Sequence, residues 1–572
     1  MSQQLANGKQ QFIDGNGNPL AGGSVAFYAP GTPNPVNTWG DSGLTVLNAN
    51  PVTLDANGMA SIWGADGTLY RQVVTDANGN QVWDQVVGLI VGAAAVTAPD
   101  GEALSALLET YLARVVTSIS ALRNVSKAYY AQCFVTGYYA SGDGGGGAYY
   151  YDASDTSSAD NGGTVIVASD GGRWKLTHTG IVSVKQFGAK GDGTTDDTAA
   201  LQAAINAAAG RSLYIPAGTY KISSSLSLAN ANGGYRIFGD APQWSSASGL
   251  VGGTIIENAN TAGAAAVSIS AGGNGTIRLT DFAIKGNGSD GNGITISGAY
   301  TTVLEGLFIA SVGSHGVELD SAYEAHLIRC SIGNIYKNGV YAHGADNAIT
   351  LRDNLFFSCD GQAAGNACVW IDGVGGNSLA PVIEGNTFEG TSASTTAFGL
   401  VAKNTNALAV RSNYFEVFGG TGGLLYFDST VVGFAVEDNY FQDGTVTFAG
   451  STNGAVNRNY FSKQTITTSL NMAPPAAGAT AVQVRANSFV GGATNNAPAS
   501  FGYVSLASGS ATVNNTNTNT GTLIAVTRIT EGSAPGFLST PTIVNGSHFV
   551  IQSSSATDDG AVMWSFVGDN GP

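Results

Sequence analysis

Charged side chains are scarce in this chain, and basic side chains are the scarcer kind. Asp, Glu, Lys and Arg form 11% of the 572 residues, and 40 acidic residues against 23 basic ones give a net charge of −17. This balance argues against a nucleic-acid partner, because the phosphates would be repelled. It leaves a polysaccharide open, because sugars are bound through hydrogen bonds and ring stacking.

Cysteine and long apolar runs are also rare. The four cysteines, whose spacing matches no zinc-binding pattern, are Cys133, Cys330, Cys359 and Cys368. We expect them to be reduced and structural, and we expect no metal and no other cofactor. The longest apolar run, residues 86–96, is too short to cross a bilayer. The N-terminus lacks the basic and apolar segments of a signal peptide, so we expect neither that export route nor membrane insertion.

The sequence is instead rich in glycine, with 80 residues of 572, about twice the usual share. Glycine tolerates the left-handed backbone that tight turns need, so this composition favours many short strands. The hydrophobic fraction of 43% is enough for a large core. We therefore predict an all-β chain of several domains.

The first 180 residues are predicted to form three parts. Residues 1–90 alternate short apolar runs with turn dipeptides such as Asp14-Gly15, which predicts a small β module. Residues 91–125 are predicted to be a helical neck or linker. Residues 126–180, rich in Gly and Tyr, are predicted to form a β segment with tight turns before the main domain.

Within the predicted neck, a helix is expected over residues 101–123, where apolar side chains recur at a spacing close to a heptad. Its apolar positions are Leu104, Leu108, Tyr111, Val115 and Leu122. Two interpretations remain open. One is a short amphipathic helix packed on a neighbouring domain, and the other is the neck of a three-stranded assembly.

The stretch FGAKGDGTTDDTAALQAAINAAAG at residues 187–210 predicts a polar turn followed by an Ala-rich helix. We expect Thr195 or Asp196 to cap the helix, because side-chain oxygens there accept bonds from its free N–H groups. We expect Gly210 to end it. Asp196 and Asp197 resemble a catalytic pair, but capping explains them, so we interpret both as structural.

An internal repeat over residues 250–490 is the most informative feature of the sequence. Its template is V-x-x-N-x-F, with copies ending at Phe356, Phe388, Phe415, Phe441, Phe461 and Phe489, and weaker copies ending at Ile284, Phe308 and Ile332. The steps between copies are 24, 24, 24, 32, 27, 26, 20 and 28 residues. A motif at such a period indicates a solenoid with one coil per repeat. The β-branched and aromatic content indicates coils made of β-strands.

Stacked coils place like residues above one another, about 4.8 Å apart. We expect the Phe residues to stack inward as a core column that includes Phe308. We expect a second column to occupy a bend and to hydrogen-bond along the stack; its members are Asn354, Asn386, Asn413, Asn439, Asn459 and Asn487. We expect a third column to alternate in charge and to serve stability; its members are Arg352, Glu384, Arg411, Glu437, Asn457 and Arg485.

A second repeat lies upstream of each Asn, and its period-2 alternation predicts one inward and one outward set of side chains. The inward set is Val317, Val340, Val369, Leu400 and Leu425. The outward set forms two columns: Glu318, Tyr341, Trp370, Val401 and Tyr426 in the first, and Asp320, His343, Asp372, Lys403 and Asp428 in the second.

Two stretches, VKQFGAKGDGTTDDTAALQAAINAA at 184–208 and YIPAGTYKI at 214–222, resemble the opening of the pectate-lyase-like β-helix superfamily. The resemblance implies a right-handed parallel β-helix over residues 181–495, with a helix that caps its first coil. It implies no single reaction, because the superfamily includes lyases, hydrolases and binding proteins.

The stretch GYYASGDGGGGAYYYDASDTSSADNGGTVIVASDGGRWKL, at 137–176, resembles a segment found just before the β-helix of bacteriophage tailspikes. Residues 1–90 are similar to a tailspike virion-attachment module. The resemblance implies a homotrimer in the virion, attached to phage tail or baseplate proteins, that binds or degrades capsule or lipopolysaccharide at the host cell surface. Residues 496–572 are then expected to form a C-terminal β cap or trimer contact.

Outward aromatic side chains on a solenoid face have no core to fill, and their flat rings suit sugar rings. We therefore predict a glycan groove on the face of the second repeat, although contact with a neighbouring subunit or a loop would also explain these side chains. The predicted substrate-binding residues are Trp370, Tyr341, Tyr426, Glu318, Lys403 and Asp428.

Glycoside hydrolysis needs two carboxyl groups, about 5 Å apart for retention of configuration or roughly 6.5–9.5 Å apart for inversion. Asp320 and Asp372, two coils apart, form one candidate catalytic pair, and His343 between them is able to be held protonated. Glu389 and Glu416, on adjacent coils, form the other pair, in which like charges are expected to raise one pKa.

These features predict an enzyme that depolymerises a bacterial surface polysaccharide by cleaving glycosidic bonds. A hydrolase is favoured over a lyase, for which Lys403 or Arg411 would neutralise a uronate carboxylate. No signature of a named lyase or hydrolase subfamily is recognisable. The alternatives are a tail fibre that binds a glycan without cleaving it, and a purely structural virion protein.

Overall fold

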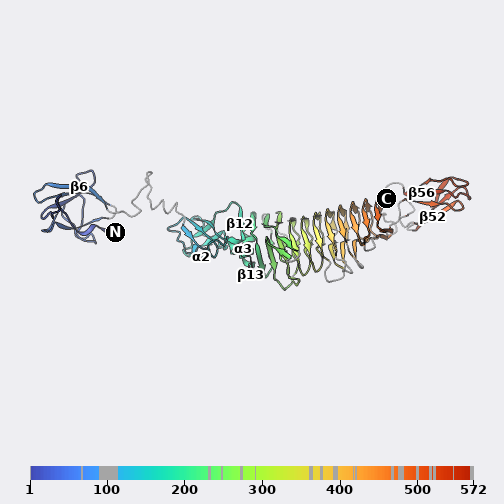
Figure 1. The fold of residues 1–572 in the computed structure, drawn as a ribbon, viewed down its shortest axis with the longest axis horizontal. Helices are drawn as coiled ribbons and strands as arrows, with labels where there is room; N and C mark the ends of the chain where they lie inside the picture. The colour runs from blue at the N-terminus through green and yellow to red at the C-terminus, as the bar shows by residue number, and fades with distance from the viewer. Residues whose placement is uncertain are drawn as a thin grey trace. The chain divides into compact units, whose positions relative to one another are not determined.

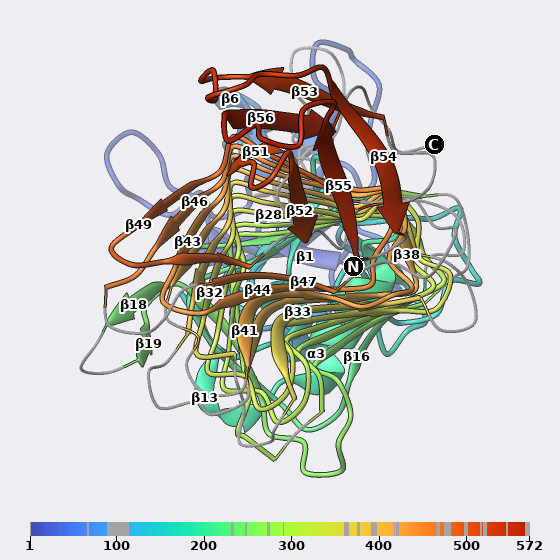
Figure 2. The same cartoon turned by 90° about the vertical axis from the view of Figure 1, so that its right-hand side faces the viewer.

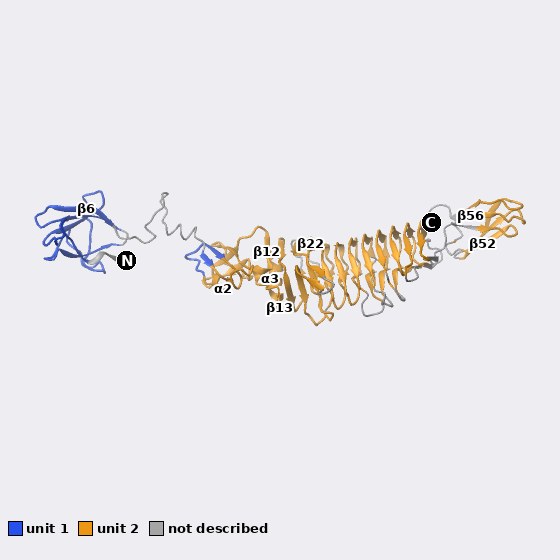
Figure 3. Cartoon of the chain, in the orientation of Figure 1, with its two compact units in different colours: residues 1–115, 125–134 blue, residues 116–124, 135–572 orange. Residues whose placement is uncertain are grey.

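The computed structural model describes residues 2–65, 68–88, 114–229, 234–245, 249–270, 275–289, 291–359, 365–373, 378–390, 397–416, 418, 422–464, 469–473, 482–496, 501–514, 518, 523–544 and 547–566. Nearly all of the regular secondary structure in these residues is β-strand, as Figure 1 shows. Two compact units are distinguished in Figure 3, one of residues 1–115 with 125–134 and one of residues 116–124 with 135–572. Of the helices in the described part, none has the length and apolar character that crossing a bilayer requires.

The N-terminal unit contains a small antiparallel β module. Its four-stranded sheet has the order β3 (Val52–Thr53), β2 (Ser24–Tyr28), β5 (Leu69–Thr75) and β6 (Gln81–Gly88), and β1 (Ser2–Gln11) pairs with β4 (Met59–Ala65). Alternate residues of β2 and β5 point inward, and Phe12, Phe27 and Tyr70 are fully buried in the core. The β module expected from the turn dipeptides is therefore present in the fold.

The predicted helix over residues 101–123 is wrong in its C-terminal part. Residues 114–123 contain the strand β7 (Arg114–Val116) and a single helical turn, α2 (Ile119–Leu122). Two β-branched valines favour the extended backbone of β7, and Ser118 then caps α2 by accepting a hydrogen bond from the N–H of Ala121. The other predicted heptad positions, from 104 to 111, lie outside the described residues, so a neck there stays a prediction.

The Gly- and Tyr-rich segment forms β8 (Gln132–Val135), β9 (Gly147–Tyr151), β10 (Val165–Val167) and β11 (Arg173–Leu176), with the antiparallel order β10-β11-β9. Trp174 is fully buried at its centre. Gly137 is required by close packing, because a Cβ atom there would lie 1.7 Å from the carbonyl oxygen of Ala140. The segment thus consists of short β-strands with tight turns, as its composition predicted.

The helix α3 (Thr198–Ala207) has its N-cap at Asp197, one or two residues later than the predicted cap at Asp196 or Thr195. The segment before it is β13 (Asp192–Asp196), and Asp197 occupies the N-cap position without a capping hydrogen bond. The carboxylate of Asp197 instead accepts hydrogen bonds from the backbone N–H groups of Lys190 and Gly191, at 2.6 and 2.8 Å. Burial raises its pKa. The turn and the helix start are therefore joined by one buried carboxylate.

Three parallel sheets form the main domain, a parallel β-helix that Figure 2 shows end-on. The first sheet has twelve strands: β12 (Ile181–Ser183), β14 (Ser212–Ile215), β17 (Tyr235–Gly239), β22 (Ile277–Thr280), β25 (Tyr300–Glu305), β28 (Tyr323–Ile328), β31 (Thr350–Arg352), β35 (Val382–Glu384), β39 (Ala409–Arg411), β42 (Ala435–Glu437), β45 (Ala455–Asn457) and β48 (Gln483–Arg485).

The second sheet also has twelve strands: β13, β15 (Gly218–Ile222), β20 (Thr254–Asn258), β23 (Ala283–Lys285), β26 (Phe308–Ala310), β29 (Ser331–Gly333), β32 (Leu355–Phe357), β36 (Thr387–Glu389), β40 (Tyr414–Glu416), β43 (Tyr440–Gln442), β46 (Tyr460–Ser462) and β49 (Ser488–Val490). The third sheet has eleven: β16 (Leu226–Ala229), β21 (Val267–Ser270), β24 (Ile294–Ser297), β27 (Val317–Asp320), β30 (Val340–His343), β33 (Ala367–Asp372), β37 (Phe398–Lys403), β41 (Gly423–Phe427), β44 (Thr445–Ala449), β47 (Ser469–Ala473) and β50 (Thr494–Asn496).

A continuous stack of phenylalanine rings fills the inner side of the second sheet. Phe388 and Phe415 are register partners with ring centroids 4.3 Å apart, and both side chains are fully buried. The predicted column is confirmed from Phe356 onward, but Phe308 is not part of it. Ile309 is the residue in register with the column, and Phe308 faces outward, with its ring stacked on Trp244 at 5.3 Å. A one-residue shift reverses the face of a strand.

The predicted asparagine column is a buried hydrogen-bonded ladder. Asn413 donates from its backbone N–H and its side-chain amide to the Oδ1 atom of Asn439, each at 2.9 Å, and its amide also donates to the carbonyl oxygen of Ile383. Its own Oδ1 accepts the same pair of bonds from Asn386. The ladder therefore pairs backbone groups at the bend that would otherwise be left without partners.

The third predicted column is also in register along the first sheet, in the order Arg352, Glu384, Arg411, Glu437, Asn457 and Arg485. Arg352 forms an ion pair with Glu384 at 3.1 Å. None of the four cysteines forms a disulfide, and all are buried. Cys330 takes the asparagine position of its coil, where its backbone N–H donates to Asn354 at 2.8 Å.

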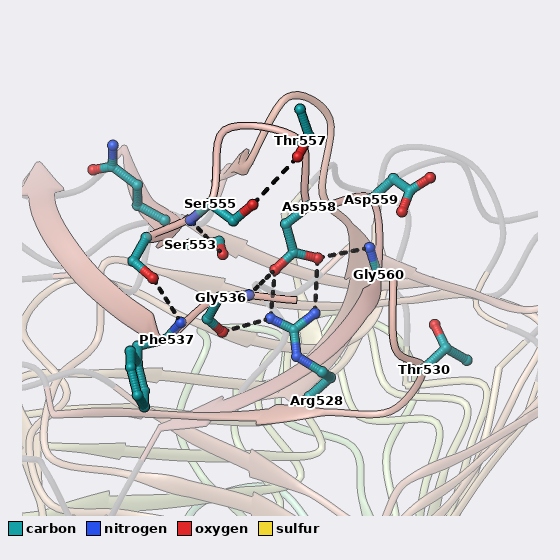
Figure 4. Close-up of polar contacts among 12 residues, drawn as sticks. Arg528, Thr530, Gly536, Phe537, Ser553, Ser555, Thr557, Asp558, Asp559 and Gly560 are labelled. Carbon is teal, nitrogen blue, oxygen red and sulfur yellow. Dashed lines mark hydrogen bonds and ion pairs between the residues drawn. The ribbon is translucent and has the colours of Figure 1, made fainter. Parts of the chain in front are cut away.

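The C-terminal domain consists of two antiparallel sheets, with the orders β51 (Phe501–Ser505), β56 (Ala561–Phe566), β53 (Ile524–Arg528) and β52 (Ser510–Asn514), β55 (His548–Ser553), β54 (Leu538–Val544). Figure 4 shows that Asp558 joins three of its segments. The carboxylate accepts from the Arg528 guanidinium at 2.8 Å and from the N–H groups of Gly536 and Gly560. The Arg528 guanidinium lowers the pKa of Asp558.

We expect Asn413→Ala to destabilise the β-helix by about 3 kcal/mol, because it leaves buried partners on two adjacent coils without their hydrogen bonds. The measurement is the midpoint of guanidinium unfolding followed by circular dichroism. Asn206→Ala, at an exposed position of α3, is the matched control and should change the free energy of unfolding by less than about 0.5 kcal/mol. Equal midpoints for both variants would contradict the structural role of the ladder.

Candidate functional site

The outer face of the third sheet carries the side chains that the second repeat predicted to point outward. β27, β30, β33, β37 and β41 pair in parallel, so that Val317, Val340, Val369, Leu400 and Leu425 form one inward column. All five are fully buried. Glu318, Tyr341, Trp370, Val401 and Tyr426 are register partners on the opposite face. Val401 is nevertheless 1% exposed, so its neighbours cover it.

Two carboxylates flank one imidazole on this face, a group that we call the acid–imidazole cluster: Glu318, Asp320 and His343, with Tyr341 and His315. The Nε2 atom of His343 lies 3.2 Å from an oxygen of Glu318, and its Nδ1 atom lies 3.9 Å from an oxygen of Asp320. The cluster is built from adjacent strands, because Asp320 and His343 are register partners. It places a carboxylate on either side of one imidazole.

Asn292 and Thr295 hold Glu318 in place by donating to its Oε2 atom at 2.7 and 3.2 Å. Asp320 accepts from the hydroxyl groups of Ser297 and Ser321, each at 3.3 Å. Such supporting bonds fix the orientation of a functional carboxylate.

Tyr341 is less available to a ligand than the sequence indicated. The imidazole rings of His315 and His343 both stack on its ring, with centroids 4.7 and 4.6 Å away. These rings take up the stacking contacts that a sugar would need, so the expected role of Tyr341 as a stacking platform is reduced to its edge and hydroxyl group. Burial lowers the pKa of His315 to about 4, and the nearby Lys337 and His343 act in the same direction.

Asp372 lies on the coil next to His343 and is its register partner. Asn404 donates to its Oδ1 atom at 2.9 Å. The ammonium group of Lys403 lies 4.8 Å from the ring centroid of Trp370, a cation–π contact that covers part of the indole.

Tyr426 contacts Phe398 at a centroid distance of 5.8 Å. Asp428 lies beyond the end of β41, where its carboxylate accepts from the N–H of Thr430 at 2.9 Å. Asp428 therefore belongs to a turn and not to the strand column in which it was predicted.

Glu389 and Glu416 lie on the second sheet, away from the other candidates. They are register partners on β36 and β40, as predicted. Both oxygens of Glu416 are engaged: Tyr414 donates its hydroxyl group at 3.0 Å, and Gln442 donates its amide at 3.3 Å. Burial and the bond to Glu416 raise the pKa of Tyr414 to about 12. The two predicted catalytic pairs therefore occupy two different faces of the β-helix.

Sequence reasoning missed Asn292 and His315, which complete the acid–imidazole cluster. A signal was present: GITIS at 293–297 is an earlier copy of the second repeat, and His315 immediately precedes the copy at 316–320. Among the described residues, His, Cys, Asp and Glu side chains form no group of three that could hold a metal ion.

Three sequence families match separate parts of the chain. Residues 115–179 match the phage tail protein small four-stranded β-sheet domain. Residues 181–270 match the rhamnogalacturonase A/epimerase, pectate lyase-like family. A segment similar to a phage-tail β domain thus precedes a β-helix whose opening is similar to the pectate-lyase-like family. Residues 496–567 match the C-terminal domain of K1 capsule-specific polysaccharide lyase.

The similarity to individual proteins is local. The chain is 55% identical over 47 residues to a capsule K30/K69-specific depolymerase of Klebsiella phage K5-2. This aligned stretch is 8% of this chain and 6% of that protein. It is 59% identical over 44 residues to alginate lyase 7 of Azotobacter vinelandii. This aligned stretch is 7% of this chain and 5% of that protein. The structure of tailspike gp49 of Acinetobacter baumannii bacteriophage Fri1 aligns with a TM-score of 0.48 at 14% identity, over 79% of this chain and 98% of that one.

We expect His315 to contribute less stability to the β-helix as the pH falls from about 6.5 to about 4. In this window the unfolded chain protonates His315 while the folded chain keeps it neutral, so acid favours unfolding. The contribution is at most about 3 kcal/mol. It is measured as the free energy of unfolding against pH for the wild type and His315→Gln.

Relative to the wild type, the free energy of unfolding of His315→Gln should rise as the pH falls across this window. His548→Gln, in the C-terminal domain, is the control and should match the wild type. A His315→Gln profile that is parallel to the wild-type profile would contradict a neutral, half-buried His315.

Proposed function

We propose that this protein is a tailspike of a bacteriophage virion that binds a bacterial surface polysaccharide and depolymerises it. The observation that carries the proposal is the order of parts in one chain. A phage-tail β domain at 115–179 leads directly into a β-helix with a pectate-lyase-like opening at 181–270, and a segment similar to part of a capsule-specific lyase follows at 496–567. The named relative from a Klebsiella phage is itself a capsule depolymerase.

The protein then acts at the host cell surface, with the N-terminal module attached to tail or baseplate proteins and with three copies forming the spike. The net charge of −17 is compatible with this setting. The solenoid supports the proposal physically, because its long outer faces present repeated side chains to a polymer that itself repeats.

Hydrolysis at the third sheet is the mechanism that the geometry favours. Asp320 and Asp372 lie two strand spacings apart, roughly 10 Å, close to the separation of an inverting glycosidase. One carboxyl group would protonate the leaving oxygen while the other activates water. Among the described residues, Asn404 alone donates to Asp372, whereas both oxygens of Glu416 are already bonded.

The first test is cleavage of purified host capsule or lipopolysaccharide, measured as loss of chain length by mass. We expect Asp372→Asn to slow cleavage by at least about a hundredfold, because acid–base catalysis is worth 10²–10⁴, and Glu416→Gln to slow it less. Full cleavage by both variants would reject both catalytic pairs. Binding without cleavage by the wild type would instead identify a glycan-binding fibre.

The anomeric configuration of the first product, followed by NMR, distinguishes the two pairs. Inversion is expected from Asp320 and Asp372, and retention is expected from Glu389 and Glu416. An unsaturated uronate at the new chain end would show a lyase and would overturn the hydrolytic mechanism.

Trp370→Ala should weaken binding of host oligosaccharide by about tenfold, because the indole is the largest aromatic surface in the predicted groove. The measurement is isothermal titration. Tyr460→Ala removes an exposed aromatic residue of the second sheet and should leave the affinity unchanged. If Trp370→Ala also leaves it unchanged, the groove lies elsewhere.

A further inference from the structure

An open hollow of about 540 Å³ lies on the first sheet, at the N-terminal end of the β-helix and on a different sheet from both candidate catalytic pairs. Three of its lining residues are arginines, namely Arg211, Arg236 and Arg278. Its volume is within the range of small-molecule binding sites. All three arginine side chains are exposed to solvent, so they are accessible to a ligand.

The register makes this arrangement unusual for the chain. Arg236 and Arg278 are direct partners on the adjacent strands β17 and β22, and like charges placed opposite each other destabilise a sheet. Farther along the same sheet, Arg352 and Glu384 are paired with opposite charges. The Arg236–Arg278 pair therefore does not add to the stability of this sheet in the way that the Arg352–Glu384 pair does.

The nearby carboxylates do not neutralise the hollow. Arg278 and Arg329 share one carboxylate, that of Glu305, with which both form ion pairs. Among the described residues, no acidic side chain pairs with Arg211 or Arg236. The sequence stretches that flank β17 and β22, residues 230–233 and 271–274, contain no acidic residue. Four guanidinium groups and one carboxylate thus leave an excess of positive charge in a chain whose net charge is −17.

The arginines are held in position. The guanidinium of Arg236 lies 4.6 Å from the ring centroid of Phe238, whose ring stacks on Tyr214 at 5.2 Å. Arg211 lies in the turn after α3, where its N–H donates to Ala208, and its Nη1 atom lies 3.2 Å from His178. Burial and the charge of Arg211 lower the pKa of His178. Side chains that are already ordered lose less entropy when they bind a ligand.

From this geometry we propose that the hollow binds a carboxylate-bearing sugar unit of an acidic polysaccharide. A guanidinium group matches a carboxylate with two parallel hydrogen bonds, and two arginines one strand spacing apart can each engage an acidic group along the same chain. The inference rests on the proposed function and adds the substrate class, an anionic glycan, which the candidate groove on the third sheet does not specify.

The test uses the full chain and three polyuronates, namely alginate, polygalacturonate and hyaluronate, with dextran as the neutral comparison. We expect the wild type to bind at least one polyuronate and not dextran, and we expect the affinity to fall as the salt concentration rises. The double variant Arg211→Gln/Arg236→Gln should weaken that binding by about tenfold or more. Arg352→Gln, an exposed arginine of the same sheet outside the hollow, should stay within about twofold.

Three results would overturn the proposal: no binding of any polyuronate, unchanged binding by the double variant, or an altered oligomeric state of that variant in sedimentation. The last result would assign the arginines to contacts between copies of the chain. Cleavage of a host polysaccharide by both the wild type and the double variant, with equal binding, rejects the hollow and leaves the proposed function intact. The absence of cleavage and of binding for every bacterial glycan rejects the proposed function itself.

Discussion

Hydrogen bonding between parallel strands of successive coils is the interaction on which the rest of this structure depends. The three sheets place each residue directly over its counterpart in the next coil. Side chains at equivalent positions of successive coils therefore form rows. A row is stable only when its members attract one another or pack closely. The phenylalanine stack, the asparagine ladder and the alternating charges are three solutions to that one requirement.

The same constraint explains how chemistry is placed on the outside. Inward positions of the third sheet are occupied by Val and Leu, which fill the core. Side chains at outward positions do not have to fill the core, so they can be polar or charged. Glu318 and Asp320 therefore meet His343 across a single strand spacing. No loop has to carry these groups, and a regular scaffold holds them more precisely than a loop would.

The outer faces differ in charge as a result. The third sheet combines carboxylates, imidazoles and an indole, the second sheet presents Glu389 and Glu416, and the N-terminal part of the first sheet presents arginines. A polymer that lies along the solenoid meets positive and negative groups in different places. The proposed binding and the proposed cleavage would then use different faces, because each face is built from its own column of positions.

The sequence by itself determined the coil, the core and the ladder. A repeat with Phe and Asn at fixed offsets leaves one way to bury the rings and satisfy the amides, and the structure confirms both columns from Asn354 to Phe489. The candidate residues were assigned to the correct strands for the same reason, with Asp428 as the exception. The outward alternation of Glu318, Tyr341 and Trp370 also followed from the sequence.

Only the tertiary structure decided which of these residues meet. Phe308 lies outside the core because Ile309 is the residue of β26 that is in register with the column, and Val115 lies in a strand instead of a helix. His315 covers Tyr341 from an adjacent coil, and Arg236 lies against Arg278 although 42 positions separate their numbers in the chain. Such contacts depend on the length of each turn between strands, which sets the register but leaves no periodic signal in the sequence.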